Sequence, residues 1–79
     1  MGTKTEPGAF DCYGKLAADE PYFTLAAHDK HAEFLVVTWA SLRAAEIARG
    51  ERDAGERAQV DEALECARSM IKWRKANRP

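Results

Sequence analysis

The feature that most limits the folds open to this chain is a long segment, Asp29 to Arg49, without glycine or proline. Asp29 is a favourable helix N-cap, and Glu33 in the following turn suits the positive end of a helix dipole. Gly50 supplies a C-terminal stop, because glycine readily adopts the left-handed conformation found at helix ends. The segment therefore predicts one long helix.

The apolar side chains of this predicted helix do not form a single stripe. At about 100° per residue they surround the axis, and only Thr38, Ser41 and Arg49 form a thin polar line. A helix of this kind must be covered on more than one side. Its apolar residues are Phe34, Leu35, Val36, Val37, Trp39, Leu42, Ile47 and five alanines.

A second long helix is predicted after the polar loop "ERDAGE" and extends to about Ala76. Asp53 with Glu56 three residues later matches a capping box. A single apolar face is flanked by a solvated face of charged residues, and the two tryptophans are expected to anchor the core. The apolar face comprises Val60, Ala63, Leu64, Ala67, Met70 and Ile71, with Cys66 and Trp73 at its side, and the charged face Asp61, Glu62, Glu65, Arg68 and Lys72.

Shorter elements are expected before the long helices. Residues 1–9, rich in glycine and polar side chains, have the composition of a flexible N-terminal arm. Asp11 is expected to cap a short helical turn that extends to Ala18. Pro21 suits the first position of a short helix ending at about Ala27, because its missing N–H would have no helical partner there.

Together these elements predict an all-α protein with a single small helical domain over residues 10–79. Its expected architecture is an antiparallel αα-hairpin of two long helices, capped by one or two short N-terminal helices. One hairpin with small caps does not surround a helix that is apolar all round. We therefore expect a dimer or higher homo-oligomer in which segment 29–49 meets its own copy, with Ala40, Ala44, Ala45 and Ala48 allowing close approach.

Composition narrows the class of function. A chain of 79 residues with a net charge of −1 has no global field that would attract nucleic acid or an anionic membrane. Two cysteines are too few for a disulfide scaffold. No apolar run is long enough for a membrane span, and the first residues resemble no signal peptide. A cytoplasmic protein without a cofactor is expected.

The residues that suggest catalysis or metal binding have simpler explanations. His28 and His31 lie beside Asp29 and Glu33, but they lack the H-x-x-x-H spacing that brings two imidazoles together on a helix. No glycine-rich elbow or oxyanion site accompanies a cysteine or serine nucleophile. The carboxylates lie where helix starts favour acids. We expect no catalytic residue and no metal ligand.

Aromatic and cationic side chains gather around the turn at Asp29. Such residues stack planar groups and bind anions, so they predict a pocket for a small nucleotide-like ligand, between helices or between subunits. The predicted ligand-binding residues are Tyr22, Phe23, His28, Lys30, Trp39 and Arg43.

The end of the chain is basic, because no acid follows Glu65. Basic residues beside Trp73 are a combination that nucleic-acid-binding proteins use, so Lys72, Arg74 and Lys75 are candidate nucleic-acid contacts. Cations also favour the last turn of any helix, and the whole chain is not basic. Nucleic-acid binding is therefore the weakest of the three functions considered.

Four motifs resemble a set of small uncharacterised proteins from bacteriophages and prophages. They are F-D-C-Y from Phe10, D-E-P-x-F-x-L-x-A-x-D-x-x-A from Asp19, W-A at Trp39, and C-A-x-x-M-x-x-W from Cys66. The likeness covers about residues 10–74 and implies no activity or site residue. What it implies is an accessory protein that acts by binding, including proteins that block host defences.

The function favoured by residues and resemblance together is non-enzymatic. The leading hypothesis is a phage accessory or counter-defence protein that sequesters a nucleotide-like ligand in the host cytoplasm. The alternative is an inhibitor or adaptor that binds a protein, such as a host defence protein, through a helical surface.

Overall fold

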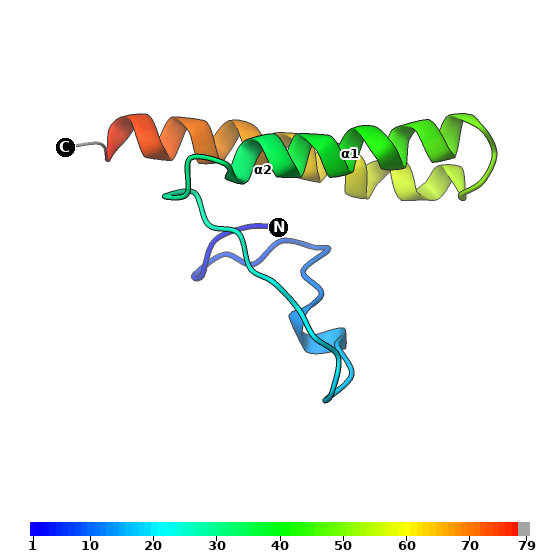
Figure 1. Ribbon diagram of the computed structural model, residues 1–79, viewed down its shortest axis with the longest axis horizontal. Coiled ribbons are helices and arrows are strands. Elements are labelled where there is room, and N and C mark those ends of the chain that lie inside the picture. Colours follow the sequence, from blue (N-terminus) through cyan, green and yellow to red (C-terminus); the bar gives the residue numbers. More distant parts are fainter. Residues whose placement is uncertain (78–79) are drawn as a thin grey trace.

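The computed structural model describes residues 1–77, and their regular structure is entirely helical. Two α-helices, α1 (Ala32–Ala48) and α2 (Arg57–Ala76), lie side by side, and each is preceded in the chain by a short 3₁₀ turn (Figure 1). These turns are η1 (Tyr13–Lys15) and η2 (Ala54–Glu56). No strand occurs in the described part of the chain, so the prediction of an all-α protein is confirmed.

A short connection returns the chain from α1 to α2. Gly50 has φ of 76°, and its N–H donates to the Ile47 carbonyl at 3.0 Å, which ends α1 as the sequence predicts. Arg52 then donates to the Glu46 carboxylate at 3.0 Å and to Glu56 at 2.9 Å. Its guanidinium thereby ties the end of α1 to the start of α2.

The start of α1 lies three residues beyond the predicted N-cap. The Asp29 carboxylate accepts a hydrogen bond from the His31 N–H at 2.8 Å, and the Ala32 N–H donates to the Asp29 carbonyl at 3.0 Å. Both bonds close a turn at 29–32 that precedes the helical ladder. Asp29 therefore organises the approach to α1, and the predicted cap at this position is wrong.

The start of α2 follows the prediction in part. The Asp53 carboxylate accepts from the Gly55 N–H at 2.8 Å and caps η2, which leads directly into α2. The Glu56 carboxylate binds Arg52 in place of completing a capping box. A carboxylate forms a stronger hydrogen bond with a charged guanidinium group than with a neutral backbone N–H.

The short helix predicted from Pro21 to Ala27 is wrong, because residues 21–26 have no regular structure. Isolated helices of this length are unstable unless one face packs against the protein. Tyr22 and Phe23 are 61% and 83% exposed, so that packing is missing. The turn expected after Asp11 is reduced to η1, and the Asp11 carboxylate instead accepts from the Gly8 N–H at 3.0 Å.

The N-terminal segment, residues 1–31, lies on one side of the helix pair and projects away from it as a long loop (Figure 1). Met1 packs against the core, and its ammonium group pairs with the Asp11 carboxylate and with Glu62 at 2.9 Å. Glu62 is consequently half-buried, whereas the sequence predicts that it is solvated.

The core between α1 and α2 consists of small side chains. Four of its five buried residues are alanines, and the fifth is a valine: Ala32, Ala40, Val60, Ala63 and Ala67. Larger apolar residues pack only partly against it, including Val36, Ile47 and Leu64. The helices approach closely as a result, but little apolar volume is buried.

The two tryptophans differ in their burial. Trp39 is partly buried against the core, whereas Trp73 is 50% exposed, so its predicted role as a core anchor is wrong. Arg74, the next residue along α2, lies under the start of α1 and binds Glu33 there. Neighbouring positions on a helix point about 100° apart, so Trp73 is turned toward solvent.

We predict that Ala63→Leu destabilises the protein by about 1–3 kcal/mol, because added methylenes at a fully buried alanine force the helices apart. Chemical denaturation followed by circular dichroism measures this loss. Ala58→Leu is the matched control, since Ala58 is exposed on the same helix. Equal stability of the two variants would show that the helices do not meet closely at Ala63.

Candidate functional site

The most exposed residues of α1 carry no charge. We call the surface that they form the uncharged face of α1. Its large apolar members include Phe34, 70% exposed, and Leu42, 63% exposed. A group of large apolar side chains in contact with water is an informative feature of a protein surface. The face consists of the exposed residues Phe34, Leu35, Val37, Thr38, Ser41, Leu42 and Ala48.

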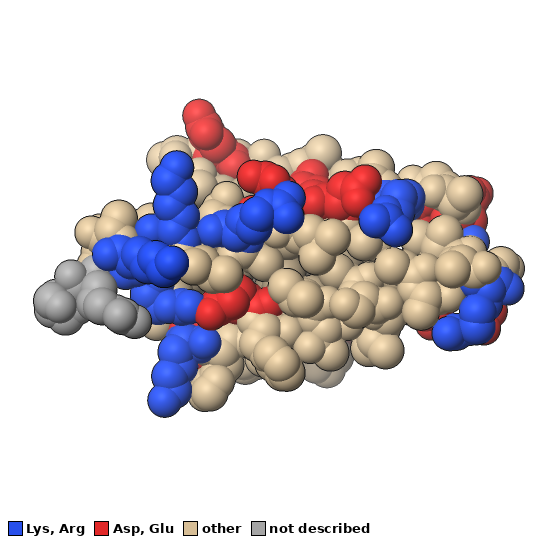
Figure 2. All heavy atoms as spheres, turned by 90° about the horizontal axis from the view of Figure 1, so that it is seen from above, with Lys and Arg blue, Asp and Glu red and all other residues tan. Residues whose placement is uncertain are grey.

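The charged side chains of α1 all turn away from this face. Each forms an ion pair with α2 or with the connection before it: Glu33 with Arg74, Arg43 with Glu56 and Glu46 with Arg52. Figure 2 views the helix pair from the side opposite the N-terminal segment, and charges there gather at the ends and along one edge. A continuous uncharged strip occupies the middle.

The polar groups of the uncharged face are few. The Thr38 hydroxyl donates to the Phe34 carbonyl at 2.8 Å, so it is already paired within the helix. Ser41 contributes the other side-chain hydroxyl, and Arg49, which follows the last residue of α1, donates to the Glu51 carboxylate at 2.6 Å. The polar line that the sequence suggests along α1 therefore offers little hydrogen bonding to a partner, and the chemistry of the face is apolar contact.

Two adjoining hollows lie on the other side of the helix pair, beneath the N-terminal segment. Their volumes are about 370 and 360 Å³, and Met1, Leu25 and Val36 line both. Trp39 and Cys12 line the larger hollow, and Phe23 and Cys66 the smaller one. Their walls are mainly apolar and offer no cluster of cations for a phosphate group.

The two cysteines are free thiols. Burial raises the pKa of the Cys66 thiol, which keeps it protonated at neutral pH. A protonated thiol is a poor nucleophile and a poor metal ligand. Cys66 therefore acts as part of the apolar wall of its hollow.

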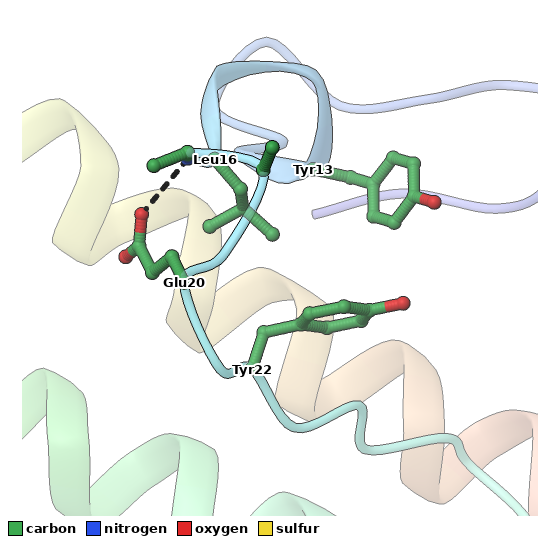
Figure 3. A pocket seen from close by; sticks show the side chains of 6 residues that line it. Tyr13, Leu16, Glu20 and Tyr22 are labelled. Carbon is green, nitrogen blue, oxygen red and sulfur yellow. Dashed lines mark hydrogen bonds between the residues drawn. The ribbon is translucent and has the colours of Figure 1, made fainter.

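A third hollow, of about 210 Å³, lies within the N-terminal loop (Figure 3). The Tyr13 and Tyr22 rings meet edge to face there, with centroids 5.6 Å apart. The Glu20 carboxylate accepts from the Ala17 N–H at 3.1 Å and closes the turn beside Leu16. All residues that line this small, open hollow belong to the N-terminal loop, so neither α-helix contributes to it.

The six residues predicted to bind a nucleotide-like ligand lie in several places. Trp39 and Arg43 are together on α1, where the guanidinium carbon is 5.3 Å from the Trp39 ring centroid. The Tyr22 ring meets the Tyr13 ring edge to face in the loop, and Phe23 lies at the smaller apolar hollow. The remaining two, His28 and Lys30, are exposed in the turn before α1. No described hollow has all six in its lining, and ligand binding by them stays a prediction.

Among the predicted nucleic-acid contacts, Arg74 has a structural role. Its guanidinium donates to the carbonyl oxygens of Ala27 at 3.0 Å and Asp29 at 2.8 Å, and to the Glu33 carboxylate. It thereby fastens the end of α2 to the turn that begins α1. Lys72 and Lys75 are exposed, and nucleic-acid contact by these two residues stays a prediction.

The sequence did not predict a binding surface at Phe34 and Leu42. Both residues do belong to the apolar residues that surround the axis of the predicted helix, and this pattern could have indicated that some of them are exposed. What the sequence does not reveal is which side of that helix α2 covers.

Within residues 1–77, no group of three or more histidine, cysteine, aspartate or glutamate side chains is arranged to hold a metal ion. Neither described α-helix combines the length and apolar character needed to cross a bilayer.

Comparison with protein-family models, curated proteins and solved structures found no match for this chain.

We predict that the Glu33–Arg74 pair makes folding sensitive to acid. The hydrogen bond from Arg74 holds the pKa of Glu33 below its ordinary value of 4.5. A group with a lowered folded-state pKa stabilises the protein above its unfolded-state pKa, and this contribution disappears as pH falls through the folded value. Glu33→Gln should therefore lower stability at pH 7 and flatten its decline below about pH 5.

Urea denaturation across this pH range measures the effect. Glu65→Gln is the control, because Glu65 and its partner Arg68 are both 68% exposed and solvent screens their pair. If the pH profile of Glu33→Gln runs parallel to that of the unmodified protein, the pair does not contribute to folding.

Proposed function

We propose that this protein is a non-enzymatic binding protein that recognises another protein chain through the uncharged face of α1. The observation that supports this best is the exposure of large apolar side chains on α1. Ala32 and Ala40 are buried, while Phe34 and Leu42 are 70% and 63% exposed. A helix with a large aromatic ring and a leucine in solvent gains stability when a partner covers them.

The physical gain from covering this face is large for so small a protein. Fully burying a Phe or Leu side chain contributes about 1.5–3 kcal/mol relative to exposure. Contiguous apolar patches of this kind on soluble proteins commonly mark interaction sites. The exposed apolar side chains Phe34, Val37 and Leu42 lie on one side of α1, and helices use such one-sided apolar residues to pack into grooves or against one another.

Protein binding agrees with the geometry better than nucleotide sequestration does. Phosphate groups need accessible cations, and Arg43 is held over Trp39 and 4.0 Å from the Glu56 carboxylate. The other aromatic and cationic candidates are spread over the loop and the turn. The hollows nearest to them are lined mainly by apolar side chains.

The resemblance to phage proteins suggests where such binding would act. The resemblance implies a small accessory or counter-defence protein that acts by binding in the host cytoplasm, and an apolar helical face is suited to binding another protein chain. Under this proposal the helix pair is a rigid hairpin that presents α1, and the ion pairs of Arg52 and Arg74 hold its two ends in place.

We predict that a photo-reactive amino acid at position 41 forms a covalent protein adduct of defined mass in the producing cells. Ser41 lies in the uncharged face of α1, whereas the control, Ser69, is exposed on α2 among charged neighbours. Denaturing electrophoresis and mass spectrometry identify the adducts. The same adducts from both positions, or none from position 41, would contradict the proposed function.

A further inference from the structure

We propose that the chain bound by the uncharged face of α1 is a second copy of this protein, related by a twofold axis. Two helix pairs then form a four-helix bundle in which α1 of one copy lies against α1 of the other. This inference rests on the proposed function and names its partner. Three properties of the described residues support a second copy over an unrelated protein.

The first property is self-complementarity. In a twofold interface the same surface faces itself, so each charged residue near the axis would approach its own copy and repel it. The most exposed residues of α1 are uncharged, and its three charged residues, Glu33, Arg43 and Glu46, are partly buried and paired with α2 or the connection before it. The Thr38 hydroxyl is already bonded to the Phe34 carbonyl. The face is therefore free of the groups that would oppose pairing with itself.

The second property is the small size of the core. Among residues 1–77 of one chain, those that are buried are four alanines and Val60, and chains of this length usually need an additional source of stability. No disulfide supplies it, since both cysteines are free. Pairing two copies through α1 moves Phe34, Val37 and Leu42 of each chain into a shared core. The large side chains missing from the single chain are then supplied by the dimer.

The third property is the extent of the open face. The N-terminal segment lies against the opposite side of the helix pair (Figure 1), where Leu35 of the uncharged face lines a hollow beside it, and an uncharged strip occupies the middle of the view in Figure 2. A helix of the length of α1 extends about 25 Å. A standard interface of about 800 Å² per partner would occupy about an eighth of the 6301 Å² surface of the chain. A helix face about 25 Å long is large enough to form the centre of such an interface.

The register of this dimer follows from the limits of the face. The uncharged face extends from Phe34 to Ala48, and its midpoint is Ser41. A twofold axis through the midpoint places Ser41 beside its copy and runs the two α1 helices in opposite directions. Phe34 of one chain then lies toward Ala48 of the other, so that a large side chain meets a small one.

Sedimentation equilibrium of the purified chain tests the proposal. We expect a mass of twice 8.8 kDa at about 100 µM. Leu42→Glu should weaken the dimer at least about tenfold, because a carboxylate is then desolvated in an apolar interface. Ala58→Glu, at an exposed position of α2, is the matched control and should leave the dimer intact. A monomer mass for the unmodified chain would overturn the proposal.

A cross-link distinguishes a lost interface from a lost fold. With Cys12→Ser and Cys66→Ala as background, mild oxidation by air should convert Ser41→Cys into a disulfide-linked dimer, and Ser69→Cys should stay monomeric. A dimer that survives Leu42→Glu and shows no cross-link through Ser41→Cys uses another surface, which would overturn the proposal. If the chain is a monomer and position 41 photo-cross-links to a different protein, the proposal of a second copy is overturned, whereas the proposed function is supported.

Discussion

The close contact between α1 and α2 is the constraint on which the other features of this protein depend. Because Ala40 and Ala63 bring the helices together, the space between them holds little more than alanine side chains and Val60. Val36, Trp39 and Ile47 pack only partly against this core, and Phe34 and Leu42 are left on the outer surface of α1. The candidate binding face is thus a direct result of how the core is built, and does not require a separate structural element.

Ion pairs at the two ends of the helix pair complete this arrangement. Arg74 joins the end of α2 to the turn before α1, and Arg52 joins the end of α1 to the start of α2. Besides holding the helices, these pairs remove the charges of α1 from its outer face. Packing and electrostatics therefore lead to the same outcome, a rigid helix whose exposed side is apolar and uncharged.

Local sequence patterns predicted those parts of the fold that depend on neighbouring residues. The end of α1 at Gly50 and the buried face of α2 at Val60, Ala63 and Ala67 follow from them directly. The false helix at Pro21–Ala27 shows the limit, because its start signals were correct but no surface packs against it. Arg74 shows the same limit for the site: its bonds to Ala27 and Asp29 join residues distant in sequence, and no local pattern indicates them.

If a second copy completes α1, the stability of the protein must depend on its concentration. A folded dimer that unfolds to two chains is stabilised by mass action. Raising the concentration from about 1 to 100 µM should therefore raise the midpoint of thermal unfolding by about 5–10 °C. A midpoint that does not change over this range would show that the chain folds alone and would contradict the account.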